Sequence, residues 1–291
     1  MSAARGGRAS AVTAAEHRLA GAGVPSPGVD AEELAAFSLG VARRDLWRHD
    51  DVGANFWSYV QRRAAREPLQ HITGRAAFRH LTLEVGPGVF VPRPETEVVA
   101  QAAIEAARRC PAAPVVVDLG TGSGAIALAV AAEVSGSRVY AVEADPVAHS
   151  WAARNCAGSA VDLRLGDMAD AFAELDGSVD VVVSNPPYIP VGAVVRDPEV
   201  AVHDPATALW SGRDGLDAIR VVARVAARLL RTGGAVVVEH ADAQGASAPE
   251  VFAASEHFTD VRDHRDLAGR DRYLTATRRP SLARPEMITG P

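Results

Sequence analysis

The sequence predicts an α/β fold, in which a mainly parallel sheet follows a small N-terminal helical domain and is joined to it by a β-hairpin. Three observations support this prediction. From residue 94 onward, strand-like and helix-like segments alternate, as is typical of βαβ units. Residues 11–75 instead carry Ala-rich amphipathic segments, as helices do. Between these regions, short apolar runs on either side of Gly86-Pro87-Gly88 predict the hairpin.

The helical region is expected to contain three helices, near residues 11–22, 30–40 and 53–66. A stretch rich in Gly, Pro and Ser separates the first two. Asp30, with Glu33 three residues later, matches a capping box, and we expect it to open the second helix. The predicted domains are a helical domain at 1–75, a hairpin linker at 76–92, a sheet domain at 93–279 and a disordered tail at 280–291.

The sheet domain is expected to hold five strands with crossover helices between most of them, followed by two strands too close together for such a helix. The last two strands should therefore form an antiparallel hairpin at the sheet edge. The predicted strands lie at 115–118, 138–142, 161–164, 179–184, 235–239, 259–264 and 272–277. The predicted helices lie at 95–109, 124–134, 146–157 and 215–231.

The composition indicates a globular protein with a substantial core. The chain has 291 residues, of which 48% are hydrophobic, and a net charge of -6, which argues weakly against binding along a nucleic-acid backbone. Its two cysteines, Cys110 and Cys156, form no CxxC motif, so we expect no disulfide framework and no metal site. The chain has no apolar run long enough for a membrane span and no signal-peptide pattern, so we expect a cytoplasmic protein.

A glycine-rich loop follows the first strand of the sheet. Its sequence is Asp118-Leu119-Gly120-Thr121-Gly122-Ser123-Gly124. Alternate glycines permit a tight turn and a close approach of a ligand to the backbone. The third glycine comes too early for the dinucleotide fingerprint GxGxxG. The spacing DxGxGxG is typical of proteins that bind S-adenosylmethionine, so we expect that cofactor here.

Four further residues are candidate cofactor contacts. Glu143 ends the second strand, where a carboxylate can accept both ribose hydroxyls. Asp167 follows the third strand, where a polar group can receive the adenine amino group. Met168 would form an apolar wall beside the adenine. Asn185, after the fourth strand, is expected to border the cofactor as well.

The tetrad Asn185-Pro186-Pro187-Tyr188 ends the apolar strand at 179–184. Proline has a fixed φ and no N–H, so the backbone must turn there. The turn presents a carboxamide, backbone carbonyls and an aromatic ring, which suit a planar substrate bearing an –NH2 group. An ordinary proline turn at a strand end is the alternative interpretation. The sequence shows no strong base near the tetrad, and we interpret His240 beside Glu239 as a structural pair.

Taken together, these motifs resemble those of the bacterial release factor glutamine methyltransferases, and the resemblance extends over nearly the whole chain. Besides the glycine loop and the tetrad, it includes Glu67–Gly74, Val91–Glu97, Asp204-Pro205 with Ala208-Leu209-Trp210, and Arg265–Gly269. Two residues depart from the family pattern, because Glu143 stands where Asp is commoner and Met168 where an aromatic residue is frequent.

The resemblance implies a Rossmann-like sheet of the class I S-adenosylmethionine-dependent methyltransferases, with the N-terminal helical domain recognising the substrate. It implies cofactor contacts at the glycine loop and Glu143, and a glutamine pocket at Asn185 to Tyr188. Asn185 and Pro186 would accept the amide hydrogens, Pro187 would stiffen the turn, and Tyr188 would pack on the amide plane. The partner would be a release factor, and we expect a monomer.

Two other substrate classes remain open, a glutamine of a ribosomal protein and the adenine amino group of nucleic acid. A non-catalytic protein that senses the cofactor is a further alternative. Arg93 and Glu97 either hold the domain junction or border the cofactor site.

Overall fold

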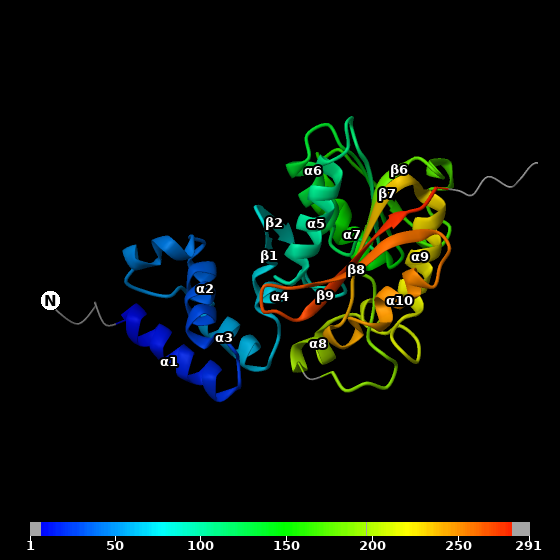
Figure 1. Ribbon diagram of the computed structural model, residues 1–291. Helices are drawn as coiled ribbons and strands as arrows, with labels where there is room; N and C mark the ends of the chain where they lie inside the picture. Colours follow the sequence, from blue (N-terminus) through cyan, green and yellow to red (C-terminus); the bar gives the residue numbers. More distant parts are fainter. Residues whose placement is uncertain (1–6, 196, 281–291) are drawn as a thin grey trace, which may run out of the picture. The chain divides into compact units, whose positions relative to one another are not determined.

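The computed structural model describes residues 7–195 and 197–280, which form two compact units (Figure 1). Unit 1 contains the described residues up to Ala76, together with Glu84–Val91 and Val194–Asp204. Unit 2 contains Ala77–Leu83, Pro92–Ala193 and the described residues from Pro205 onward. The tail predicted to be disordered lies almost entirely outside the described residues.

Unit 1 is helical. Its elements are α1 (Gly7–Gly21), α2 (Pro27–Leu39), η1 (Arg43–Arg48), α3 (Phe56–Ala64), α4 (Leu69–Thr73) and α8 (Pro198–His203). The three predicted helices correspond to α1, α2 and α3. Leu19, Leu34 and Phe56 are fully buried in the core of the unit. The short helix α8 comes from a segment far along the chain that folds together with the N-terminal helices.

The predicted capping box is wrong. Helix α2 begins at Pro27, with Ser26 as its N-cap residue, so Asp30 already lies inside the first turn. Proline favours the first position of a helix because its fixed φ suits the helix and its missing N–H has no partner to lose there. The Asp30 carboxylate is buried instead, and its Oδ2 accepts a hydrogen bond from Arg63 Nε at 2.7 Å.

The β-hairpin is confirmed, but its turn is not at Gly86-Pro87-Gly88. Strand β1 (Arg75–Phe78) pairs with β2 (Leu81–Glu84), so the turn consists of Arg79 and His80. Arg79 adopts a positive φ of 52°, which is unfavourable for a residue with a Cβ. Tertiary contacts compensate, because Arg79 N donates to Glu97 Oε1 at 3.0 Å and the guanidinium pairs with Glu133. Glu97 therefore holds the hairpin turn.

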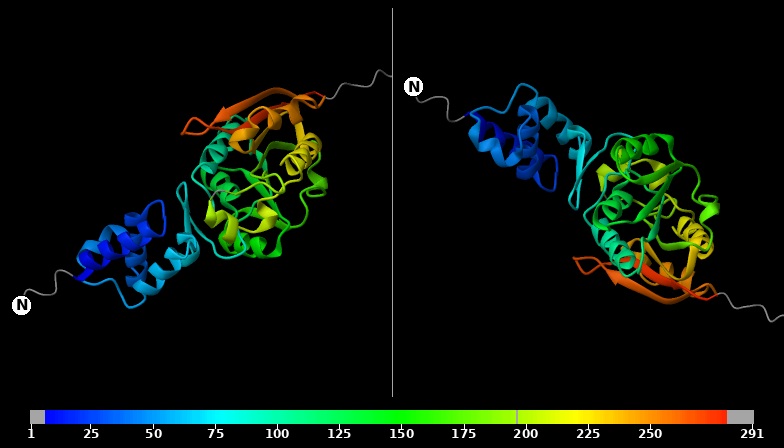
Figure 2. Two further views of the ribbon diagram at one scale, coloured as in Figure 1. Left: turned by 90° about the horizontal axis from the view of Figure 1, so that it is seen from below. Right: turned by 90° about the horizontal axis from the view of Figure 1, so that it is seen from above.

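Unit 2 contains a seven-stranded sheet in the order β5-β4-β3-β6-β7-β9-β8 (Figure 1). Its strands are β3 (Val115–Leu119), β4 (Arg138–Glu143), β5 (Val161–Leu165), β6 (Val179–Ser184), β7 (Leu230–Glu239), β8 (Phe258–Arg265) and β9 (Asp271–Arg278). The neighbouring pairs β5–β4, β4–β3, β3–β6 and β6–β7 are parallel, and β9 is antiparallel to both β7 and β8. The hairpin β8–β9 lies at the sheet edge, as predicted (Figure 2).

Helices lie on both sides of this sheet. In Figure 1, α5 (Thr96–Arg108) and α6 (Ala125–Glu133) lie on one side, and α9 (Asp217–Leu229) and α10 (Ser247–Ala253) on the other. Helix α7 (Pro146–Cys156) follows β4, and three short 3-10 helices complete the unit: η2 (Ala173–Leu175), η3 (Ala206–Ala208) and η4 (Asp242–Gln244). Alternate residues of β3, namely Val115, Val117 and Leu119, pack in the same core as the apolar face of α9. The arrangement is the predicted mainly parallel sheet, and the structure adds that helices cover both of its faces.

The two cysteines are free, and Cys156 is buried while Cys110 is half-buried. None of the helices in the described part of the chain has the length and apolar character needed to cross a bilayer.

Candidate active site

The glycine loop and the tetrad leave the sheet side by side. Strands β3 and β6 are parallel neighbours, with Asp118 paired to Val183. Gly120 and Asn185 each come two positions later, so they leave at the same level of two strands spaced about 4.8 Å apart. Ser184 Oγ also donates a hydrogen bond to Leu119 O at 2.7 Å. Strand order reverses between these strands, and α/β sheets bind ligands at such a point.

The glycine loop leaves space above its backbone. Gly120 and Gly122 have φ values of 71° and 59°, in the left-handed region that favours glycine. A Cβ built at either position would meet no atom within 4 Å. The N–H groups of Gly120 and Thr121 both donate to Val142 O at 3.0 Å, which fixes the loop to the end of β4. A ligand can therefore lie directly on this backbone.

Asp118 lies beneath the loop and is 1% exposed. Its Oδ2 accepts hydrogen bonds from Thr121 Oγ1 at 2.6 Å and Ala127 N at 3.1 Å. Its Oδ1 is buried without a hydrogen-bond partner among the described residues. Burial raises the pKa of this carboxyl to about 7. The free oxygen is suited to a cationic or N–H donor of a ligand.

Glu143 ends β4, beside the loop, and is half-buried. Its Oε2 accepts from Gly122 N and its Oε1 from Asp145 N, each at 2.9 Å. The two bonds fix the plane of the carboxylate. Each oxygen keeps a second lone pair, so a pair of hydroxyl donors can still bind to it.

The structure also shows what the remaining predicted cofactor residues contact within the chain. Gly124 is a packing position, because a Cβ there would lie 3.3 Å from Cys156 Sγ. Ser123 is buried, and its carbonyl accepts from the side chain of Asn155 at 2.9 Å. Asp167 is exposed, and its Oδ1 accepts from Ala169 N at 2.8 Å. Met168 packs against the sheet core.

The tetrad is held by the segment that follows it. Pro186 is buried, and Asn185 and Tyr188 are half-buried. Ile189 N donates to Leu209 O, and Ile189 O accepts from Ser211 N, both at 2.8 Å. This pairing places the Ala208-Leu209-Trp210 motif beside the tetrad, although the sequence alone did not reveal its role.

Two residues that the sequence analysis left without a site role adjoin the tetrad. Asn185 Nδ2 donates to Thr96 Oγ1 at 3.3 Å, and the Tyr188 hydroxyl donates to Glu239 Oε1 at 3.3 Å. The Thr96 hydroxyl also acts on the Glu239 carboxylate as a hydrogen-bond donor. Glu239 is therefore a buried carboxyl beside the tetrad, where the sequence analysis did not place it, and burial raises its pKa to about 7.

The expected pair of His240 and Glu239 does not form. The two side chains alternate across β7, so they point to opposite faces of the strand. The His240 ring contacts Asp263 Oδ1 through Nε2 at 2.8 Å and Ala241 O through Nδ1 at 2.9 Å. Arg93 lies close enough to Tyr188 for its charge to act on the phenol. Burial nevertheless raises the pKa of Tyr188 above its usual value, so the phenol remains a donor.

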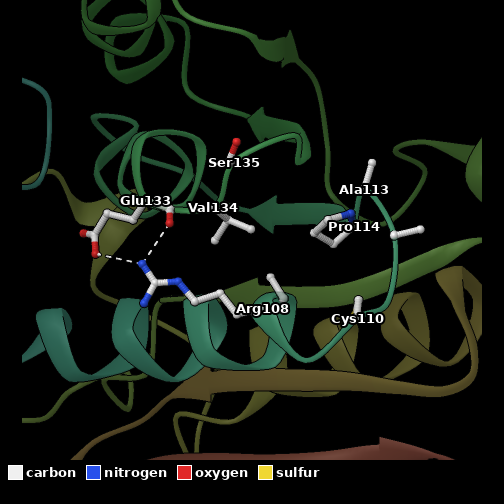
Figure 3. Close-up of a pocket in the computed structure, with 9 residues that line it drawn as sticks. Arg108, Cys110, Ala113, Pro114, Glu133, Val134 and Ser135 are labelled. Carbon is white, nitrogen blue, oxygen red and sulfur yellow. Dashed lines mark hydrogen bonds and ion pairs between the residues drawn. The ribbon is translucent and has the colours of Figure 1, made fainter.

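A cavity of about 360 Å³ lies elsewhere in unit 2, between the ends of α5 and α6 (Figure 3). Pro114, which lines it, immediately precedes β3, so the cavity is at the amino edge of the sheet, opposite the two motifs. Figure 3 shows Arg108 directed at Glu133, and Arg108 donates to Glu133 O at 2.8 Å. We do not assign the cofactor to this cavity, because ligands of such sheets bind at the carboxyl edge.

Two family models match parts of the chain. Residues 10–74 match the family model described as the PrmC N-terminal domain, and residues 82–199 match that of the methyltransferase small domain. A release factor glutamine methyltransferase of Streptomyces coelicolor is 58% identical over 269 residues, which cover 91% of this chain and 96% of that protein.

Two further comparisons involve proteins named for other substrates. A 4-amino-L-phenylalanine/4-methylamino-L-phenylalanine methyltransferase of Streptomyces pristinaespiralis is 42% identical over 98% of this chain and 100% of its own length. Among solved structures, a T. thermophilus 16S rRNA methyltransferase in complex with AdoMet and guanosine has a TM-score of 0.51 and 22% identity, and covers 70% of this chain and 50% of that one. This last likeness supports the class of fold.

Proposed function

The chain belongs to the family of release factor glutamine methyltransferases, and from this premise we propose that it methylates the glutamine of the Gly-Gly-Gln motif in peptide chain release factors. The methyl group would pass from the sulfonium of S-adenosylmethionine to the side-chain amide nitrogen, which leaves S-adenosylhomocysteine, and the methylated nitrogen would then lose one proton to water. The observation that carries the proposal is the pairing of Asp118 with Val183, which brings the glycine loop and the tetrad to one edge.

The residues present fit the cofactor. The open backbone at Gly120 and Gly122 can lie against its amino-acid and ribose portions. The partnerless Oδ1 of Asp118 can accept from its amino group, and the fixed carboxylate of Glu143 can accept from its ribose hydroxyls. Bound there, S-adenosylmethionine supplies an electrophilic methyl group on a sulfonium. Asp167 remains a candidate for the adenine edge, since it is exposed beyond β5.

The tetrad would hold the substrate amide in line with that methyl group. Asn185 Oδ1 and the Pro186 carbonyl accept the two amide hydrogens, and the Tyr188 ring packs on the amide plane. An amide nitrogen is a weak nucleophile because its lone pair is delocalised into the carbonyl. Placement therefore contributes most, and good alignment can supply about 7–11 kcal/mol of the barrier. Acceptors on the N–H groups stabilise the positive charge that develops on nitrogen.

The proposal is tested by incubating the protein with labelled S-adenosylmethionine and a release factor, with and without its Gly-Gly-Gln glutamine changed to glutamate. We expect label in the release factor only when the glutamine is present. Asn185→Ala should abolish most transfer while the protein still binds the cofactor, measured separately by equilibrium dialysis. Unchanged transfer by Asn185→Ala would remove Asn185 from its assigned role.

A second function is favoured by one observation, the 42% identical relative named for 4-amino-L-phenylalanine. An aromatic amine is also a planar –NH2 group, which the tetrad could hold. The same labelling experiment therefore includes free 4-amino-L-phenylalanine, a ribosomal protein fraction and adenine-containing nucleic acid. Label in one of these in place of the release factor would reassign the substrate.

A further inference from the structure

A buried polar path leads from the tetrad into the core of unit 2. It begins at Asn185 Nδ2, which donates to Thr96 Oγ1 at 3.3 Å. It continues from the Thr96 hydroxyl to the Glu239 carboxylate, which also accepts from the Tyr188 hydroxyl at 3.3 Å. Thr96 is 3% and Glu239 2% exposed. Packing alone does not explain why Glu239 lies there, because burying a carboxylate is costly unless it makes specific hydrogen bonds.

Hydrogen-bond chemistry fixes which group donates and which accepts at each step of this path. A threonine hydroxyl has one hydrogen. Because Thr96 points that hydrogen at Glu239, its oxygen can only accept from Asn185. Asn185 must therefore turn its Nδ2 toward Thr96, and its Oδ1 remains for a ligand. The opposite orientation would present an N–H donor to the two hydrogens of an amide substrate, and the contact would be repulsive.

We propose that Thr96 and Glu239 are positioning residues, which hold the Asn185 carboxamide with its oxygen facing the acceptor amide. The inference rests on the proposed function, because the oxygen matters only for a substrate that donates N–H groups. Neither residue touches the substrate. Glu239 acts through Thr96 on one side of the pocket and, through the hydroxyl of Tyr188, on the ring that packs against the amide.

The direction of the path depends on the charge of Glu239. A protonated carboxyl can donate to the Thr96 oxygen, which releases the threonine hydrogen to turn toward Asn185. The charged groups around Glu239 are Glu95, before α5, and Arg272, on β9, with the neutral Tyr188 completing its surroundings. Arg272 favours the carboxylate, and Glu95 and burial oppose it. Burial dominates, so the pKa of about 7 places the change near neutral pH.

The decisive experiment compares Thr96→Ser with Thr96→Val. Serine keeps the hydroxyl, and valine keeps the shape without it. We expect Thr96→Ser to retain wild-type turnover with the release factor. Thr96→Val should lose about tenfold in kcat, the magnitude of one buried hydrogen bond, with unchanged affinity for S-adenosylmethionine. Thermal denaturation of both variants shows whether they fold equally well.

Glu239→Gln supplies an independent readout, because it removes the titration while keeping the size of the side chain. In wild-type protein kcat should rise with pH around neutrality, and in Glu239→Gln this rise should be absent. Equal turnover of Thr96→Val and Thr96→Ser, or the same pH profile for wild type and Glu239→Gln, would overturn the inference. Neither result would affect the proposed function, which rests on labelling by the wild-type protein.

Discussion

Replacing Asp118 with asparagine should stabilise the protein at alkaline pH while weakening its cofactor site. The structure favours this substitution, since Oδ2 makes both hydrogen bonds and Oδ1 has no partner among the described residues. An asparagine can keep its carbonyl oxygen at the Oδ2 position and place its NH2 where no bond is lost. The change therefore removes a buried charge and little else.

The magnitude follows from the pKa of Asp118, which burial raises from 3.8 to about 7. Between these values the folded protein keeps a proton that the unfolded chain has lost. Stability contributed by the neutral carboxyl is therefore fully present below pH 3.8 and is lost as the pH rises through about 7. At about 1.4 kcal/mol per pH unit, the whole difference amounts to about 4 kcal/mol.

Urea denaturation of the protein without cofactor, at intervals from pH 5 to pH 8, measures this difference. We expect the free energy of unfolding of Asp118→Asn to rise relative to that of wild type as the pH increases across the range. We also expect Asp118→Asn to bind S-adenosylmethionine more weakly at pH 8. Asp242→Asn, at an exposed position, is the control and should follow wild type. A constant difference in stability between Asp118→Asn and wild type across the range would refute the reasoning, since no proton would then be linked to folding at this site.

Two further substitutions test contacts of the tetrad and of the chain that follows it. Gly215→Ala should lower kcat by at least tenfold, the factor that about 1.4 kcal/mol of misplacement produces, because a Cβ there would lie 2.4 Å from Tyr188 O. Steady-state kinetics measures kcat, and an unchanged value would show that the tetrad tolerates displacement of the Tyr188 carbonyl. Arg63→Met should destabilise unit 1 by about 3–5 kcal/mol, because the buried Arg63 pairs with both Asp30 and Glu199 at 2.7 and 2.8 Å. Thermal denaturation followed at the tryptophans of unit 1 checks this, and an unchanged transition would mean that the ion pairs contribute nothing net.

The sheet could be predicted because its strands are short apolar runs with clear ends. The run at 179–184 is ended by Asn185 and the two prolines that follow it, and the structure gives the same bounds for β6. Parallel strands leave a sheet at a common edge, so placing the glycine loop and the tetrad on neighbouring strands was enough to bring them together.

The errors come from residues whose local preference is overridden by distant partners. Asp30 has the spacing of a cap, yet its carboxylate goes to Arg63, 33 positions away. Gly86-Pro87-Gly88 has turn chemistry, yet the chain turns at Arg79, whose positive φ is compensated by bonds to Glu97 and Glu133. No local pattern contains these partners.

Glu239 illustrates a signal that was present and misread. Glu239 ends the buried run Val236-Val237-Val238, and burying a glutamate carboxyl there is costly unless neighbouring groups form hydrogen bonds with it. The adjacent His240 suggested a partner in sequence, but neighbours along a strand point to opposite faces. The relevant partners are Tyr188 and Thr96, which lie on the neighbouring strand end and the first turn of α5.

The chain that follows the tetrad leaves unit 2 and later returns to it. After Ala193 the chain joins unit 1, where Glu199 pairs with Arg63 and Arg66 at 2.8 Å each, and at Pro205 it returns to unit 2. The returning residues then pair with Ile189, directly after the tetrad. Ordering the residues that follow the tetrad costs conformational entropy. The backbone hydrogen bonds between Ile189, Leu209 and Ser211, all within unit 2, offset part of that cost and hold the end of the tetrad.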